Sequence, residues 1–384
     1  MFTRIHRLRK NERGMSLVFV SMGFMSFLAA TTLAIDVGMF MNSRSQAQNA
    51  ADAGALAGAV ALVVNSFTNR SASGPAVQGA MSAARANTVA GASVSVVPAD
   101  VTFPNDPSGQ PNRVQVQVYR TGERSNPVPT LMGTFFGVRT VNITATATAE
   151  ASPANAETCV KPFTIPDKWI EQQNPPWDAD DTFDLRDKHG NLLPNGDVYI
   201  PADQPGYTGY DADRDKGLQL VLKANNQNKV APSFYNPWDL PGSVGASDYR
   251  DNIANCNTAV IPIGDPMTPE PGNMVGPTAQ GTNDLVARDP GAYWDTTCNC
   301  VRGSAYGRSP RVAIIPLYDP AYYEEGKYNG KGASLKIANY LGFFIEGMQG
   351  NEVVGRVTPV TGVLDGNAGP APAGAFPKVI RLVQ

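Results

Sequence analysis

The hydrophobic pattern of the chain is dominated by one long apolar run close to the N-terminus. Residues 14–35 contain no charged side chain, and about 22 such residues are enough for one helix to cross the hydrocarbon core of a bilayer. We therefore predict a transmembrane helix over residues 15–40. The basic segment 1–14, which precedes it, is typical of a tail that stays in the cytoplasm. These features predict a single-pass membrane protein with its N-terminus in the cytoplasm and its bulk outside.

A cleaved secretory signal is the alternative interpretation of the same stretch. The basic start is present, and Thr32-Leu33-Ala34 resembles a weak small-x-small cleavage site. The apolar run is longer than that of a usual signal, however, and it continues beyond this site. The pattern favours an uncleaved anchor, and both interpretations export the rest of the chain.

Residues 41–65 are predicted to continue the membrane helix outward as a stalk. The segment is rich in alanine and has no proline, which favours helix. Ala50, Gly54 and Gly58 recur every four residues, and glycine on one helix face indicates close contact with another element. That element could be a partner helix, in this chain's homo-oligomer or in another protein, or the chain's own sheet. The second is favoured because a soluble domain follows directly.

Two further regions follow the stalk and place the chain in the α+β class. Residues 66–150 are predicted to form a small α+β domain, with helices at 75–90 and 127–137 and alternating strands at 92–97, 113–119 and 140–148. Residues 151–384 are rich in proline, aromatic residues and turns, and are predicted to form a β-rich extracytoplasmic domain whose sheet is closed by the C-terminal strand. Its clearest strand candidates are 311–317, 335–346, 352–360 and 378–383.

The four cysteines all follow residue 150, at Cys159, Cys256, Cys298 and Cys300. In an exported chain an even number of cysteines indicates disulfides. Because cysteines separated by one residue rarely bridge each other, Cys298 and Cys300 are predicted to pair separately with Cys159 and Cys256. A zinc site is disfavoured, since no C-x-x-C spacing occurs.

Composition argues against nucleic-acid binding and against catalysis. The net charge is only −3, so nucleic acid is not an expected partner. His189 is the single histidine beyond the apolar run; its surroundings are those of a turn, and no nucleophile-elbow, P-loop or dinucleotide motif accompanies it. We therefore predict no catalytic residues and no enzymatic activity.

Clustered aspartates are the remaining candidate chemistry. Asp211, Asp213 and Asp215 alternate before a glycine, and oxygen ligands in this arrangement could bind Ca²⁺. Lys216 and Leu222 do not fit an EF-hand loop, and a solvated turn is the favoured interpretation. A second cluster of aspartates lies at residues 178–184. In a hydrolase such carboxylates would act as the acid and the base, but the spacing in the sequence gives no support for the separation that this requires.

The N-terminal stretch resembles the TadE/TadG-like proteins of Flp (tight adherence) pilus assembly. The matching segments are 12–14 before the apolar run, 34–38 (AIDVG) at its end, and 46–58 (QAQNAADAGALAG) beyond it. The resemblance implies an inner-membrane protein that serves pilus assembly, secretion or surface attachment. Phe19 stands where pilin-like members carry glutamate, and the D-x-S-x-S metal motif of larger members is missing.

Together these features predict a membrane-anchored structural or assembly component of a Flp/Tad-type pilus or a related secretion and attachment system. Its expected partners are the membrane and other assembly proteins, some of which could bind the stalk helix. The alternative function is a calcium-dependent extracytoplasmic binding module or adhesin.

Overall fold

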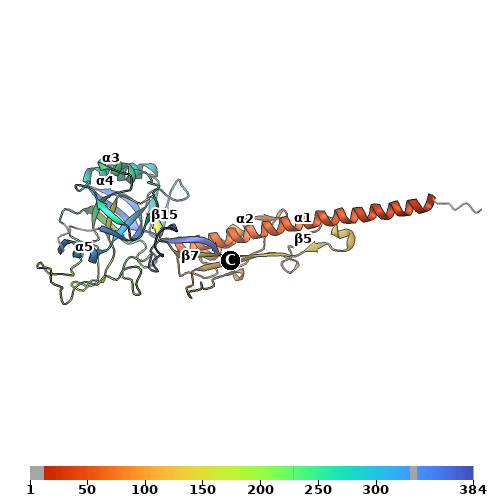
Figure 1. Ribbon diagram of the computed structural model, residues 1–384, viewed down its shortest axis with the longest axis horizontal. Coiled ribbons are helices and arrows are strands. Elements are labelled where there is room, and N and C mark those ends of the chain that lie inside the picture. The colour runs from red at the N-terminus through yellow and green to blue at the C-terminus, as the bar shows by residue number, and fades with distance from the viewer. Residues whose placement is uncertain (1–12, 228, 329–334, 384) are drawn as a thin grey trace, which may run out of the picture.

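The computed structural model describes residues 13–227, 229–328 and 335–383. Almost all of the predicted cytoplasmic tail, residues 1–12, lies outside this described part. The molecule is elongated, with a β-barrel at one end, a helix-and-sheet unit in the middle, and half of a long helix extending from the other end (Figure 1). The predicted α+β class is confirmed, including the N-terminal helix, the β-rich outer region and its disulfides.

Helix α1 (Arg13–Val64) is continuous over 52 residues, as the absence of proline and the run of alanines predict. Its two halves differ in exposure. Large apolar side chains between Met15 and Ile35 are exposed, among them Phe19 at 67% and Phe27 at 66%. From Ala47 onward one face of the helix is buried, and Ala50, Ala51 and Leu62 are 0% exposed.

The buried half of α1 packs with α2 (Pro75–Ala86) against one antiparallel sheet. The strand order of this sheet is β19-β7-β4-β3. Its strands are β3 (Val101–Thr102), β4 (Arg113–Arg120), β7 (Ile143–Pro153) and β19 (Lys378–Val383). Smaller elements complete the unit: β1 (Thr88–Val89), β2 (Ala92–Ser93), β5 (Val128–Pro129), β6 (Thr140–Val141), and the 3-10 turns η1 (Pro98–Asp100), η2 (Gly122–Arg124) and η3 (Gly133–Phe136). Side chains alternate between the two faces of β4 and β7, and the face that packs against the helices carries valines and alanines.

The helix expected over 127–137 is a β-hairpin instead, formed by β5 and β6 with the η3 turn at its tip. Pro129 has no backbone N–H and disfavours helix at the preceding residue. Backbone N–H groups of residues 131–133 also donate to a side chain of α1 rather than to a helical carbonyl. The tertiary contact therefore overrides the local propensity. The strand expected over 92–97 is likewise shorter, since β2 ends at Ser93.

Six strands of the outer region close into a barrel. Around the barrel they follow the order β10, β18, β17, β16, β9 and β11, and β11 pairs with β10 again. Two of these pairings, β16–β9 and β10–β11, are parallel. The strands are β9 (Phe163–Pro166), β10 (Gln219–Ala224), β11 (Phe234–Asp239), β16 (Val312–Tyr318), β17 (Leu335–Gln349) and β18 (Glu352–Val357).

The remaining elements of the outer region cover or extend the barrel. The helices are α3 (Gly245–Ala254), α4 (Val275–Arg288) and α5 (Pro320–Tyr328). Short strands are β8 (Ala156–Glu157) paired with β12 (Ile261–Pro262), β13 (Pro266–Pro269) between β11 and β17, and the hairpin β14 (Tyr293–Asp295) with β15 (Cys300–Arg302). Aromatic side chains such as Phe163, Tyr340 and Phe343 fill the core, as the interior of a small barrel requires.

The C-terminal strand does not close the outer sheet, so that prediction is wrong. β19 pairs with β7, in a register that sets Lys378 opposite Pro153 and Val383 opposite Thr148. The alternation in its sequence shows a half-buried strand but not which edge it joins. Because β7 is otherwise an edge strand, the chain end satisfies its open backbone groups and ties the barrel to the helix-and-sheet unit.

The predicted disulfide connectivity is also wrong. The bridges join Cys159 to Cys256 and Cys298 to Cys300. Asn299 adopts a left-handed conformation (φ 52°) at the end of the β14–β15 hairpin, and this turn brings the Cα atoms of its two neighbours to 5.3 Å. Cysteines separated by one residue rarely bridge each other when the backbone is extended. Here the backbone turns at Asn299, so the two cysteines can form a disulfide.

Candidate functional site

The helix stripe singled out by the sequence packs against the same chain. Ala50 is fully buried. A Cβ atom on Gly54 would lie 3.1 Å from the Ala80 carbonyl oxygen of α2, and one on Gly58 would lie 2.8 Å from Cγ1 of Val114 on β4. The glycines are thus needed for close approach of α1 to both neighbours. The contact favoured by the sequence, with the chain's own domain, is the one present.

This packing leaves a different face of α1 for any partner. The stripe of Ala50, Gly54 and Gly58 is covered by α2 and β4, so a second helix cannot reach it without unfolding the unit. The exposed side chains between residues 42 and 49 are polar: Asn42, Arg44, Ser45, Gln48 and Asn49. A partner that binds α1 at residues 42–49 would therefore meet a polar surface, whereas the exposed side chains nearer its C-terminal end are Val60 and Val64.

Asp36 links the end of the exposed apolar half to the β5–β6 hairpin. The residue is only 6% exposed. Its carboxylate accepts backbone N–H groups from Leu131 (3.0 Å), Met132 (3.2 Å) and Gly133 (2.6 Å). Successive N–H groups around one carboxylate form charge-assisted bonds that are stronger than neutral ones. The hairpin tip is thereby fixed beside the point where the apolar run ends.

We expect Asp36→Ala to lower the local stability of the hairpin by about 2 kcal/mol, because three N–H groups lose their charged acceptor. Hydrogen exchange at residues 131–133 measures this as faster exchange. Asp52→Ala is the matched control on the same helix, since within the described residues the Asp52 carboxylate accepts a single, exposed hydrogen bond, from the Gln48 amide at 2.9 Å. Equal exchange in the two variants would contradict the role assigned to Asp36.

The aspartates considered for calcium lie in the turn between the barrel and the end of α1. Asp215 accepts from Lys168 Nζ at 2.7 Å. Asp213 accepts the backbone N–H of Phe67 at 3.1 Å, and Asp211 accepts that of Asp213 at 3.0 Å. Burial by itself raises the pKa of Asp215, but the bonds from Lys168 and its neighbours keep that pKa below its ordinary value. All three carboxylates therefore have protein donors.

No group of three His, Cys, Asp or Glu side chains able to hold a metal ion occurs in the described parts of the chain. The calcium interpretation of Asp211, Asp213 and Asp215 stays a prediction that this geometry does not favour. The neighbouring Lys216 instead donates from Nζ to the carbonyls of Val64 (3.1 Å) and Asn65 (2.8 Å). This cation satisfies carbonyls at the C-terminus of α1.

The other acidic cluster and His189 also lie in turns. The Asp178 backbone N–H donates to Oδ2 of Asp181 at 2.6 Å, and the Asp180 N–H donates to Oδ1 of Asp178 at 2.8 Å. His189 is exposed, and its backbone N–H donates to Oδ1 of Asp187 at 2.8 Å. These are local Asx-type bonds, and none provides positive evidence for catalysis.

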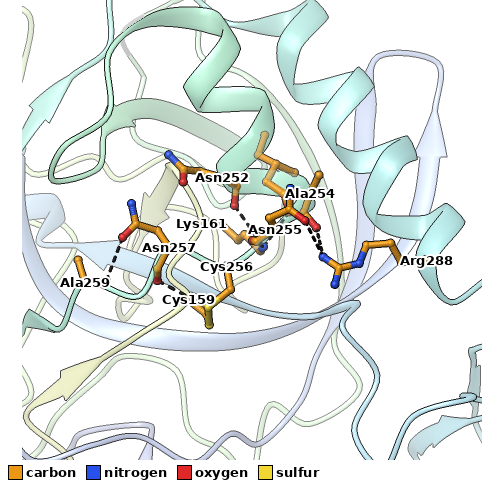
Figure 2. Close-up of a disulfide and its surroundings, with 10 residues drawn as sticks. Cys159, Lys161, Asn252, Ala254, Asn255, Cys256, Asn257, Ala259 and Arg288 are labelled. Carbon is orange, nitrogen blue, oxygen red and sulfur yellow. Dashed lines mark hydrogen bonds between the residues drawn. A yellow bond between two sulfur atoms is a disulfide. The ribbon is translucent and has the colours of Figure 1, made fainter.

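The disulfide between Cys159 and Cys256 lies beside the C-terminal end of α3 (Figure 2). Lys161 donates from Nζ to three backbone carbonyls there, at 2.7 to 3.3 Å. Arg288 donates to the carbonyl of Ala254 at 2.7 Å (Figure 2). Both cations therefore satisfy the last carbonyls of the helix. The cavity beside the disulfide has a volume of about 320 Å³, and its charged lining residues are Lys161, Arg288, Arg308 and Glu157.

Glu157 lines the same cavity and is 2% exposed, and none of the residues that the structure describes donates a hydrogen bond to its Oε1 atom. Burial raises its pKa from 4.5 to about 8. Between pH 4.5 and 8 the folded protein therefore binds a proton at Glu157 that the unfolded chain releases. The contribution of Glu157 to the free energy of unfolding is fully present below pH 4.5 and is lost as the pH rises toward 8.

We expect Glu157→Gln to remove this loss, so that the variant matches the wild type near pH 4.5 and exceeds it in stability at pH 8. Urea unfolding at the two pH values measures the difference. Glu123→Gln, in an exposed turn, is the control for removing a carboxylate. Wild-type and Glu157→Gln profiles that run parallel would show that Glu157 is not the cause.

Sequence reasoning did not identify Asp36, Lys161 or Glu157 as site residues. For Asp36 a signal existed, because it is the first charge after the apolar run and lies in the AIDVG segment. Lys161 and Glu157 carry no such signal, since their importance depends on burial by segments far away in the sequence.

The comparison with known families bears on α1. Residues 14–61 match a family described as putative Flp pilus-assembly TadE/G-like. The N-terminal helix is therefore similar to the TadE/G-like family over these residues. The match includes the exposed apolar half, Asp36 and the glycine stripe, and confirms the resemblance predicted for this stretch. It ends before α2 and does not extend to the barrel. No curated protein and no solved structure matches the chain.

Proposed function

We propose that the chain is a membrane-anchored structural component of a Flp/Tad-type pilus or of a related secretion and surface-attachment system. The proposal depends on one observation above all. A single TadE/G-like helix has one half that is apolar and exposed, and another half that is the core of a folded unit. Exposed apolar surface of this extent is costly in water and fits the interior of a bilayer.

The length and flanks of the helix support the same proposal. Residues 14–35 would span about 33 Å as a helix, close to the roughly 30 Å of a bilayer core. Among the described residues, α1 is the one helix that is long and apolar enough to cross a membrane. The basic residues before it favour a cytoplasmic N-terminus, and two disulfides fit an oxidising compartment outside.

The continuity of α1 suggests a mechanical role. The helix passes from the exposed half into the buried half without interruption, and its outer half packs against both α2 and the sheet. The body would therefore keep a defined orientation to the membrane instead of moving on a flexible linker. A defined orientation suits a protein that holds other assembly components in place. No observation favours the calcium-dependent adhesin.

Genetic complementation tests the proposal. Loss of the chain is expected to abolish pilus assembly, secretion or attachment in the cells that make it, and the full chain is expected to restore the process. A variant with residues 1–35 replaced by a cleaved secretion signal exports the same body without an anchor and is expected not to restore it. Unchanged assembly, secretion and attachment without the chain would contradict the proposed system, and restoration by the exported body would contradict the need for an anchor.

A further inference from the structure

The tip of the β5–β6 hairpin exposes a group of large apolar side chains outside the barrel and the helix core. Four of them are more than half exposed: Leu131 (58%), Phe135 (81%), Phe136 (67%) and Val138 (51%). Residues 130–138 contain no charged side chain, and Arg139 follows directly. Exposed phenylalanines gathered in this way mark a contact surface rather than a solvated turn.

The position of this tip relative to α1 indicates what covers it. Leu131, Met132 and Gly133 bind the Asp36 carboxylate, and Asp36 is the first charged residue after the apolar run. The sheet approaches from the outer side, because Gln48 of α1 donates to the Thr146 carbonyl of β7 at 3.2 Å. In Figure 1 the hairpin of β5 extends from the sheet along α1 toward its exposed half. The aromatic tip thus lies at the height where the helix would leave the bilayer.

The backbone of the tip is also suited to an apolar environment. Asp36 accepts three of its N–H groups, the N–H groups of Phe135 and Gly137 donate to Met132 and Thr134, and that of Val138 donates to Gly133. The hydroxyl of Thr130 donates to the Val138 carbonyl at 2.6 Å. Backbone groups satisfied within the protein can enter the region between headgroups and acyl chains at low cost.

We infer that the hairpin tip, residues 130–138, inserts into the outer leaflet of the membrane that α1 crosses. The inference rests on the proposed anchor and extends it, since the body then contacts the bilayer at two places. Phe135 and Phe136 enter the interfacial region, where aromatic side chains are favoured, and Arg139 lies at the level of the headgroups. Two contacts fix the rotation of the body about α1, which one helix alone leaves free.

Fluorescence quenching in vesicles of the full chain tests this inference. Phe135→Trp adds an emitter at the tip, and it is benign for folding because the side chain is 81% exposed. The matched control is Val244→Trp, because Val244 is 84% exposed and is the N-cap residue of α3. Helix α3 lies on the barrel, at the far end of the molecule (Figure 1). The four native tryptophans, Trp169, Trp177, Trp238 and Trp294, lie in the outer region and supply the background.

Lipids brominated near the headgroup end of the acyl chain are expected to quench the emission added at residue 135 and not that added at residue 244. Phe136→Trp repeats the measurement at the adjacent position. A protein that stays with the vesicles but shows no quenching at either tip position would overturn the inference and leave the anchor intact. Blue-shifted but unquenched emission would assign the tip to a protein contact, such as a second copy, and would also overturn it. A protein that does not stay with the vesicles would overturn both the inference and the anchor.

Discussion

The double substitution Cys159→Ala/Cys256→Ala is expected to lower the free energy of unfolding of the barrel by about 4 to 5 kcal/mol. The two cysteines are 97 residues apart, so their bridge removes much of the conformational freedom of the unfolded chain. The segment that it closes contains β9, β10, β11 and α3. All four tryptophans lie in the outer region, and guanidinium unfolding followed by their fluorescence therefore reports on this part of the molecule.

The matched control is Cys298→Ala/Cys300→Ala, which opens a bridge with a sequence separation of 2. Its expected cost is about 1 to 2 kcal/mol, because a loop this short constrains the unfolded chain little. Equal losses in the two double variants would contradict the account of the outer region, since they would mean that loop closure does not stabilise it. Mass mapping without reduction checks the connectivity directly.

Gly58→Leu is expected to destabilise the helix-and-sheet unit by about 3 kcal/mol or more. Even the Cβ atom would lie 2.8 Å from Val114 of β4 and 3.1 Å from the Ala80 methyl group of α2. The rest of the side chain has no space, so α1 would have to move away from both neighbours. Thermal unfolding in detergent, followed by far-ultraviolet circular dichroism, measures the loss.

Gly38→Leu is the control for the same chemical change on the same helix. A Cβ atom at Gly38 meets nothing within 4 Å, and leucine has the higher helix propensity. The control is therefore expected to leave stability unchanged or slightly raised. If Gly58→Leu behaves like Gly38→Leu, the tight packing of α1 on its own domain is wrong, and an intermolecular role for the glycine stripe becomes the better interpretation.

The features predicted correctly from sequence are those encoded by local patterns. The charge-free run and the alanine-rich segment predict the course of α1, and the spacing of Gly54 and Gly58 predicts a close contact. Strict alternation predicts β4 and β7 to within a few residues at their ends. Each of these signals lies within one element and needs no knowledge of the rest of the chain.

The features that sequence reasoning missed depend on contacts between distant segments. Residues 127–137 form a hairpin because Asp36, almost a hundred positions earlier, binds the N–H groups at its tip. β19 joins β7, although its own alternation would suit any sheet edge. The barrel is closed by two parallel pairings, of β9 with β16 and of β10 with β11. Strands β9, β10 and β11 lie in a stretch rich in proline and turns. The choice of disulfide partners likewise follows from the turn at Asn299 and not from the spacing of the cysteines.

The central claim is that α1 is one uncleaved helix with its apolar half in the membrane and its other half in an outer body. Protease accessibility on sealed membranes, combined with mass analysis of the N-terminus, tests it most directly. The account predicts an intact N-terminus in the membrane fraction and a body that protease digests only from the outer side. A mature chain that begins near Ile35 and is recovered in the soluble fraction would contradict it.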